Sequence, residues 1–353
     1  MGLILSVLVT GCQSIAYYSQ AVGGQTDIWL KQRDIEAVLA DPHIDSTIKT
    51  RLQTAQQARA FASNVLKLPE NRSYSRYANL GRDYVAWNVV ATPRYSVDAI
   101  KSCFPIIGCV SYRGYYQKEA ALKHARSKKQ AGLDVYVGGV TAYSTLGWFD
   151  DPLINTMFTR SEVATVGLIF HELAHQQVFI KGDTKFNESF ATAVEQLGLR
   201  QWAADQEASH VLDEYFANKQ KRKMVANLVL NAREQMREAY QDNQSAGEDR
   251  LAMVKREQFD KLKDQYAALK QVGKGTPGFD RFFASELNNA SLALFGEYHG
   301  WVVAFERLFK ISGENWEAFY KAVDMLSQKP ESQRNQRLKM LSEPGLLILF
   351  PGY

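Results

Sequence analysis

The sequence predicts an α+β fold that is mostly helical. Three segments between residues 84 and 146 are rich in Val, Ile, Tyr and Thr and are bounded by Gly or Pro, a pattern typical of strands. Most of the remaining chain carries apolar residues at helical spacing. A chain of 353 residues is long enough to bury a sizeable core, in one large domain or in two closely packed ones.

The first region after the N-terminus is expected to consist mostly of helices. Ala58, Ala62, Val65 and Leu66 recur there at helical spacing. The three strand-rich segments then cover residues 84–97, 104–116 and 135–146, and a helix rich in Lys and Ala, residues 117–129, separates the last two. After them the chain is expected to be helical almost to its end.

Residues 200–272 predict a long helical hairpin with its turn at 242–247. Leu251, Val254, Leu262, Tyr266 and Leu269 have the spacing of a helix seam. The many charges of this hairpin are most simply a solvated face, and a lid or a partner-docking arm is the functional alternative. The expected organisation is an apolar leader (residues 1–11), an N-terminal helical region (12–80), a small β-sheet region (81–160), two helices (161–200), the charged hairpin (201–275) and a C-terminal helical region (276–353).

The most specific feature of the chain is the segment His171-Glu172-Leu173-Ala174-His175. Positions i and i+4 share one face of a helix, so both imidazoles can hold one cation. Glu172 can then take a proton from a water on that cation, which is the pattern of a zinc peptidase helix. Thr159 and Glu162 predict a capping box, and the apolar run at 163–170 predicts that this helix is buried.

Glu188 completes the expected metal site. Gly182 and Asp183 are expected to end the first helix, and a second helix is expected to begin near Asn187. Glu188 lies thirteen residues after His175, which allows the second helix to bring a third ligand back to the metal. Three protein ligands and one open position are the pattern of a catalytic site holding one Zn²⁺ per chain.

These residues resemble the gluzincin metallopeptidases, and residues 187–195 look like the NExFAxxxE segment of zinc aminopeptidases. The resemblance implies that His171, His175 and Glu188 bind zinc, that Glu172 is the general base, and that Glu195 orients a ligand histidine. Thr192 stands where those enzymes carry an aspartate. A small sheet followed directly by the motif helix is also the zincin arrangement, in which a sheet edge runs beside the metal and can bind substrate backbone.

The chain resembles still more closely a family of predicted bacterial aminopeptidases that occur as lipoproteins. Besides the metal motif, the segments that carry this resemblance are residues 108–110, 112–115, 142–148, 151–152 and 288–290.

The N-terminus predicts a lipid anchor. Residues 1–11 are mainly apolar and end in Val9-Thr10-Gly11 before Cys12, which looks like a bacterial lipobox. Cleavage before Cys12 would leave that residue to carry the lipid, and Gln13 beside it favours the outer membrane. We therefore expect an envelope protein that faces the periplasm, and the alternative is an ordinary apolar N-terminal helix.

The sequence does not determine which residue binds the free amine of the substrate or which residue stabilises the oxyanion. Related aminopeptidases bind the substrate's free amine through a glutamate near the edge strand, here residues 137–147, but no glutamate occurs there. Asp150 and Asp151 are the nearby alternatives, so both exopeptidase and endopeptidase activity are possible. An oxyanion donor is expected from Tyr298 first and His299 second.

Two further properties of the sequence are its cysteines and its net charge. Cys103 and Cys109 could form a disulfide or remain buried thiols. The 42 basic and 38 acidic residues give a net charge of only +4, which offers no electrostatic case for nucleic acid.

The sequence thus predicts a zinc-dependent enzyme that hydrolyses peptide bonds, most simply an aminopeptidase. The alternatives are a zinc endopeptidase, a related lipoprotein that binds peptides or envelope partners without cleaving them, and a structural envelope protein in which zinc holds helices together.

Overall fold

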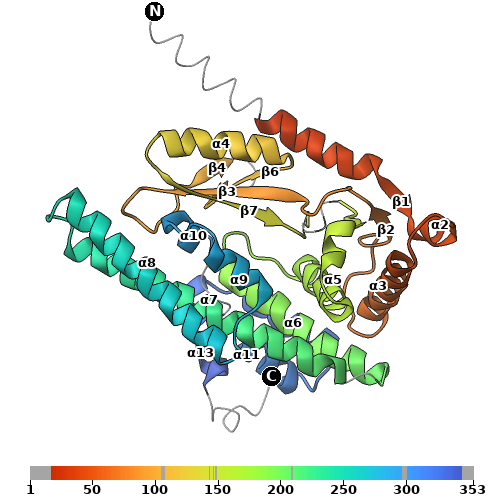
Figure 1. Cartoon of the computed structure of the whole chain (residues 1–353). Helices are drawn as coiled ribbons and strands as arrows, with labels where there is room; N and C mark the ends of the chain where they lie inside the picture. The colour runs from red at the N-terminus through yellow and green to blue at the C-terminus, as the bar shows by residue number, and fades with distance from the viewer. Residues whose placement is uncertain are drawn as a thin grey trace, which may run out of the picture. The chain divides into compact units, whose positions relative to one another are not determined.

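The computed structural model describes residues 17–104, 108–142, 144–145, 147, 149–207, 210–295 and 300–343 (Figure 1). Helices predominate and the strands form small sheets, so the expected α+β, mostly helical fold is confirmed. The chain divides into two units. The sheet unit consists of the residues up to 31 with 80–143 and 217–296, and the helical unit consists of 32–79, 144–216 and the residues from 297 onward.

The sheet unit is built on a three-stranded antiparallel sheet with the order β6-β3-β7. Its strands are β3 (Ala86–Thr92), β6 (Arg113–Tyr115) and β7 (Asp134–Val140). Helix α4 (Lys118–Gln130) packs against β3 and β7, as Figure 1 shows. Strands therefore form within each predicted segment, and the helix forms between the last two, but β7 ends at Val140 instead of near residue 146. Strand β7 lies at an edge of this sheet.

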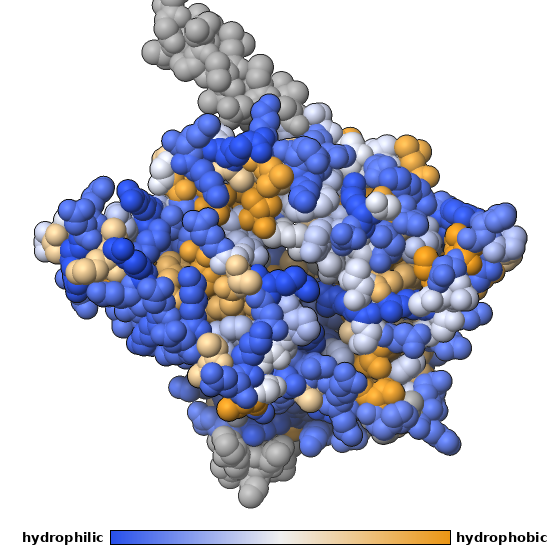
Figure 2. Space-filling view, in the orientation of Figure 1, coloured by the Kyte–Doolittle hydropathy of each residue, from blue (hydrophilic) through white to orange (hydrophobic). Residues whose placement is uncertain are grey.

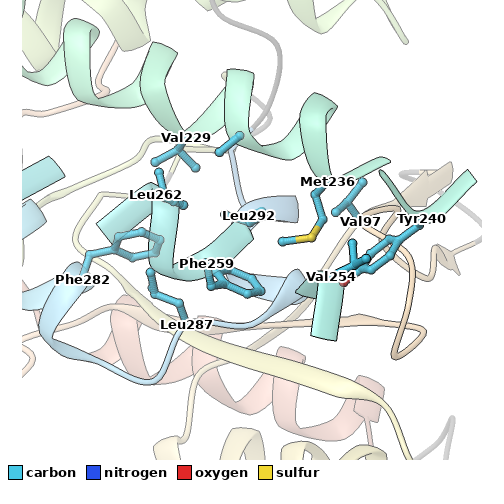
Figure 3. Packing of buried hydrophobic residues seen from close by; sticks show 11 residues of the cluster. Val97, Val229, Met236, Tyr240, Val254, Phe259, Leu262, Phe282, Leu287 and Leu292 are labelled. Carbon is cyan, nitrogen blue, oxygen red and sulfur yellow. The ribbon is translucent and has the colours of Figure 1, made fainter. Parts of the chain in front are cut away.

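The charged hairpin of the sheet unit consists of α7 (His210–Asp242) and α8 (Glu248–Gln271). Figure 3 shows the apolar cluster that joins them, in which Val229 and Met236 of α7 meet Val254 and Leu262 of α8. The short helices α9 (Pro277–Ala284) and α10 (Asn289–Ala293) follow and contribute Phe282 and Leu292 to the cluster. The first turns of α7, residues 210–216, belong to the helical unit.

The segment 288–290 has a structural role in the sheet unit. Asn288 caps α10 by accepting hydrogen bonds from two backbone amides in its first turn. The Asn289 side chain is fully buried, accepts a hydrogen bond from the Tyr240 hydroxyl at 3.0 Å, and donates one to the carbonyl of Arg94 at 2.9 Å. Residues 288–290 therefore connect α10 to α7 and to the loop that follows β3.

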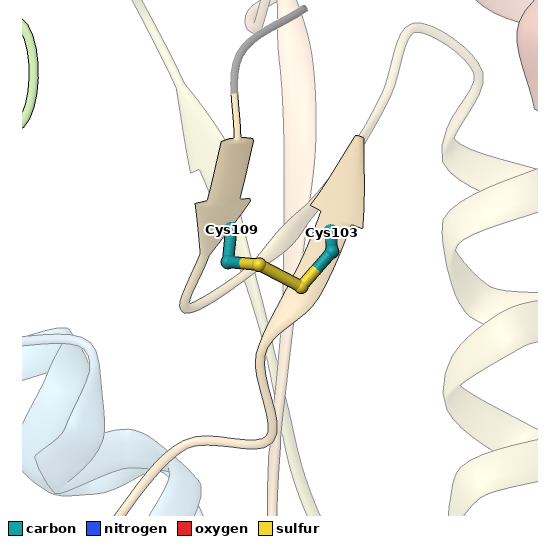
Figure 4. Close-up of a disulfide and its surroundings, with 2 residues drawn as sticks. All are labelled: Cys103 and Cys109. Carbon is teal, nitrogen blue, oxygen red and sulfur yellow. A yellow bond between two sulfur atoms is a disulfide. The ribbon is translucent and has the colours of Figure 1, made fainter. Parts of the chain in front are cut away.

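A disulfide joins Cys103 and Cys109 (Figure 4). The two cysteines are directly opposite each other in the antiparallel pair β4 (Ser102–Phe104) and β5 (Gly108–Val110). Opposed strand positions bring the two Cβ atoms close enough for the bond. Of the two states that the sequence left open, the structure contains the disulfide.

The helical unit surrounds a small sheet with the order β1-β2-β8, in which β2 is antiparallel to β1 and parallel to β8. Its elements are β1 (Gln32–Asp34), α2 (Ile35–Ala40), α3 (Ser46–Asn64), β2 (Arg76–Ala78), β8 (Leu153–Ile154), the 3₁₀ helix η1 (Asn155–Thr159), α5 (Glu162–Gln177), α6 (Thr184–Asp205), α11 (Val302–Ile311), α12 (Trp316–Ser327) and α13 (Glu331–Ser342).

Helices α5 and α6 form the centre of the helical unit, with α3 and α11 packed beside them. Gly198 allows this close contact, because a Cβ atom there would lie 2.7 Å from Cδ1 of Leu66 and 3.0 Å from Cδ2 of Phe170. Phe170 is fully buried and directly precedes His171. The packing at Gly198 therefore supports the part of α5 that carries the metal motif.

The starts of both central helices differ from the prediction. Ser161, and not Thr159, caps α5, because its hydroxyl directly precedes the helix and accepts a hydrogen bond from the amide of Ala164. The predicted Thr159–Glu162 capping box is therefore wrong, and the Thr159 hydroxyl bonds instead to the carbonyl of Thr156. Helix α5 ends at Gln177, before Gly182, and α6 begins at Thr184 instead of near Asn187.

Asp183 explains why α6 begins early. Its side chain accepts a hydrogen bond from the amide of Phe186 at 3.0 Å, which caps the helix. Its Oδ2 atom also receives two hydrogen bonds from the guanidinium of Arg334 on α13, at 3.1 and 2.6 Å. The beginning of α6 is thus tied to the last described helix.

The surface drawn in Figure 2 is mainly hydrophilic, with its hydrophobic residues in separate patches. Within the described ranges, no helix combines the length and the apolar character needed to cross a membrane.

Candidate metal centre

Helix α5 places both motif histidines on one face. Its apolar residues are buried against the core, and the rings of His171 and His175 lie with centroids 4.9 Å apart and almost perpendicular. The side chains of His171 and His175 are only 15% and 5% exposed. Helical spacing alone therefore brings two imidazoles together in a largely dry environment.

Helix α6 brings Glu188 to these histidines. Asn187, directly before it, is buried and bonds both to the amide and to the carbonyl of Ile180, each at 2.8 Å. This paired contact fixes the loop between α5 and α6. The sequence pattern marked Asn187 as the expected start of the second helix and as part of the resemblance, and its two hydrogen bonds to Ile180 could not be predicted from the spacing.

The geometry of the three side chains suits a tetrahedral metal ion. Nε2 of His171 lies 3.3 Å from Oε2 of Glu188, and Nε2 of His175 lies 3.5 Å from Oε1. One ligand atom from each residue falls within 4.8 Å of the others. Zinc with bonds of about 2.0–2.1 Å requires its tetrahedral ligands to be about 3.3–3.5 Å apart. Both His–Glu distances fall in this range, although they run to different oxygens of Glu188, so the three residues suit such an ion.

The electrostatics of the cluster favour a positive charge. Burial lowers the pKa of His171, but hydrogen bonds to Glu188 and Glu195 outweigh it and raise this pKa to about 10. Burial raises the pKa of Glu188, and its contacts with His171 and His175 outweigh that effect and hold the pKa well below its usual range. Carboxylates that stabilise a proton here would equally stabilise a bound cation, which requires neutral imidazoles.

Glu195 lies on the other side of His171. Its Oε2 is 3.3 Å from Nδ1 of His171, and its other carboxylate oxygen accepts a hydrogen bond from the hydroxyl of Tyr215, in the first turns of α7. This places Glu195 where it can orient a ligand histidine, as the resemblance implies. Nothing in the sequence pattern singled out Tyr215, which lies twenty residues after Glu195.

Glu172 is half-buried on α5, between the two histidines in sequence, and it does not belong to the ligand cluster. Its charge raises the pKa of two buried neighbours, Tyr74 and Asp151, for each of which burial is the larger cause. The carboxylate of Glu172 therefore lies near the buried Asp151. In the chain, Glu172 directly follows the metal-ligand candidate His171.

Asp151 and Asp150 have different environments. The side chain of Asp151 is 2% exposed and accepts hydrogen bonds from the amide of Thr145 at 2.7 Å and from the hydroxyls of Ser144 and Thr145. Asp150 is 51% exposed and lies 3.9 Å from Nε of Arg72. Asp151 is therefore engaged with its own loop, and of the two candidates for binding a substrate amine Asp150 is the one that is accessible.

Three further site predictions fall outside the described residues. These are Cys12, the lipidation candidate, and the oxyanion candidates Tyr298 and His299.

Comparison with known proteins identifies a family for this chain. A family model described as "Putative aminopeptidase" matches residues 16–338, which is nearly the whole chain and includes the metal cluster and its supporting residues. No curated protein and no solved structure matches the chain. The chain therefore belongs to the "Putative aminopeptidase" family.

Proposed function

We propose that this protein is a zinc-dependent metallopeptidase of the gluzincin type that acts as an aminopeptidase in the bacterial envelope. The single observation that carries the proposal is the cluster of His171, His175 and Glu188, whose ligand atoms lie within 4.8 Å of one another beside Glu172. Among the residues that the structure describes, no fourth His, Cys, Asp or Glu joins this cluster. That composition favours a catalytic site over a closed structural one.

The residues have separate roles in the proposed reaction. Zinc held there would polarise the scissile carbonyl and lower the pKa of a water. Glu172 accepts the proton of the attacking water and passes it to the leaving amine. Glu195 accepts a hydrogen bond from the Nδ1–H of His171, which leaves the unprotonated Nε2 of that ring directed toward Glu188 and the metal.

Family membership supports aminopeptidase activity on peptide substrates. The lipobox before Cys12 supports a lipid anchor, with the enzyme facing the periplasm from the outer membrane. Exposed Asp150 is the candidate that would bind the substrate's free amine and so restrict cleavage to N-termini.

The experiment combines zinc content with cleavage of a mixed peptide library by the chain lacking residues 1–12. We expect about one zinc per chain and chelator-sensitive release of single N-terminal residues. Glu172→Gln should keep the zinc and lower kcat by at least about 10²-fold, because it removes the general base. Glu162→Gln, an exposed position on the same helix, is the matched control and should retain activity.

Other outcomes would change the proposal. Internal cuts would make the protein an endopeptidase. Stoichiometric zinc in His171→Ala would refute the ligand assignment, and zinc without cleavage of any peptide would favour a binding or structural role.

A further inference from the structure

The sheet unit contains a pocket, and its lining residues include none of the metal cluster. Its volume is about 290 Å³, and it lies between β3, the disulfide hairpin, β6, α4 and the helix formed by residues 17–30. Its polar lining includes Tyr17, Lys101, Arg113, His124 and Lys128. Neither family membership nor the metal chemistry assigns a role to this pocket.

Three basic side chains line the pocket, and none of them is paired with an acidic side chain in the described ranges. Lys101, Arg113 and Lys128 line it, and among the residues that the structure describes no Asp or Glu does. None of these three cations forms an ion pair with a residue in the described ranges. In the same unit, Lys255 is paired with Asp134 at 2.5 Å, which is how a partly buried cation is ordinarily stabilised. Three cations around one cavity repel one another unless an anion lies between them.

Arg113 is held in place for such an anion. Its guanidinium lies over the ring of Tyr17, 4.1 Å from the centroid, and within 5.9 Å of the ring of Tyr115. Its Nε atom is buried and has no hydrogen-bond partner in the described part of the chain. Buried donors are usually satisfied, so the guanidinium of Arg113, which lines the pocket, keeps an unused donor. The planar fork of arginine matches the oxygens of a phosphate group.

The pKa of His124 reflects the positive charges that line the pocket. Burial lowers its pKa, and the charges of Arg113 and Lys128 lower it further, to about 4. The imidazole is therefore neutral at pH 7 and can donate one hydrogen bond. An anion bound among these cations would offset their effect and raise this pKa.

We propose that this pocket binds a phosphate group, either as inorganic phosphate or as a phosphate monoester. A phosphate of this kind carries a charge of about −1.5 to −2 and three acceptor oxygens, whereas one carboxylate would offset only one of the three cations. Tyr17 also lies five residues after Cys12. If Cys12 carries the proposed lipid anchor, five residues reach at most about 18 Å, so lipid headgroups are within reach. The phosphate can thus come from solution or from a lipid.

The test uses the full chain with Cys12→Ser, which removes the acylation site but no other part of the protein. Calorimetric titration with inorganic phosphate should show saturable binding with one site per chain. Arg113→Gln and Lys128→Gln should each weaken it by about tenfold or more. Lys129→Gln, an exposed neighbour on α4 that does not line the pocket, is the matched control and should bind as the parent does.

Thermal melting shows whether each variant is folded. Lys101→Gln provides a second probe, because Lys101 is exposed and its replacement cannot disturb the core. Nuclear magnetic resonance should show the pKa of His124 rising when phosphate is added. Absence of phosphate binding to the folded parent chain, or an equal loss of affinity in Lys129→Gln, would overturn the proposal.

Vesicle flotation separates the two sources of phosphate. Stronger binding to phosphatidylcholine vesicles that contain phosphatidic acid, reversed by inorganic phosphate and lost in Arg113→Gln, would identify a lipid phosphate. Phosphate binding in solution with equal binding to both kinds of vesicle would identify a soluble ligand. Neither result depends on peptidase activity, so failure here and failure of the proposed function are distinguishable.

Discussion

The hydroxyl of Tyr215 donates a hydrogen bond to one carboxylate oxygen of Glu195, and the other oxygen of Glu195 faces Nδ1 of His171 at 3.3 Å. The phenol thus fixes the carboxylate, and the carboxylate fixes the imidazole. Tyr215 acts on His171 through Glu195, so we assign it as a positioning residue.

Removing this hydroxyl should weaken metal binding without abolishing it. Tyr215→Phe keeps the ring and frees one oxygen of Glu195, and we expect the zinc affinity to fall about 10-fold, as is usual for outer hydrogen bonds to metal ligands. Competition with a chromogenic chelator measures the affinity. Tyr77→Phe is the matched control, since the buried Tyr77 hydroxyl has no hydrogen-bond partner within the described ranges. Equal zinc affinity in Tyr215→Phe and in the parent would contradict the positioning role.

Metal removal should lower the thermal stability of the protein. A ligand that binds only the folded state adds about 2.7 kcal/mol to the free energy of unfolding at 100 times its Kd. We therefore expect a chelator to lower Tm and added zinc to restore it. His171→Ala should show no zinc-dependent change in Tm, whereas His210→Ala, at an exposed position at the start of α7, should respond as the parent does. A zinc response that survives in His171→Ala would place the metal elsewhere.

Asp151 should make stability depend on pH. Burial raises its pKa from the ordinary value of 3.8, and the charge of Glu172 adds to the shift. An acid with a raised pKa in the folded state favours folding below its unfolded pKa, and loses that contribution as the pH rises through its folded-state pKa.

The variant Asp151→Asn cannot titrate, so it isolates this effect. The free energy of unfolding of the parent minus that of Asp151→Asn should decrease as the pH rises from about 3 to 7. Denaturant unfolding at several pH values measures it. A flat difference for Asp151→Asn would show that its carboxyl is not perturbed.

Gly198 should tolerate no side chain. A Cβ atom at this position would lie 2.7 Å from Leu66 and 3.0 Å from Phe170, and both neighbours are buried. We expect Gly198→Ala to destabilise the fold by about 1–2 kcal/mol, because overpacking exceeds the gain in helix propensity. Gly278→Ala is the control, since nothing lies within 4 Å of its Cβ position on helix α9. There the substitution should be neutral or stabilising by a few tenths of a kcal/mol. Chemical denaturation compares the two.

The sequence predicts the local part of the site well, and the reason is geometric. His171 and His175 are four residues apart on one helix, so their proximity follows from the helical repeat. The alternation of strand-rich and helical segments likewise gives the α+β class, and the seam residues of α8 together with the turn at 242–247 indicate the hairpin.

Contacts between distant segments could not be read in the same way. Tyr215 reaches Glu195 only because the first turns of α7 lie beside this residue of α6, and no periodicity encodes that contact. Ser161 and Thr159 are both good caps, and which of them begins α5 depends on the 3₁₀ turn that precedes it. The state of Cys103 and Cys109 depended on strand register, which a five-residue gap does not determine.

The pairing of Asp183 with Arg334 bears on how this protein can be shortened for expression. Asp183 begins the helix that carries Glu188, and Arg334 near the C-terminal end supplies its counter-charge, with the two side chains only 14% and 6% exposed. A chain cut before residue 331 would leave a buried carboxylate without its partner at the base of the metal-site helix. Trimming the apparently remote C-terminal helix should therefore yield a protein that loads metal poorly, even though every ligand is still present.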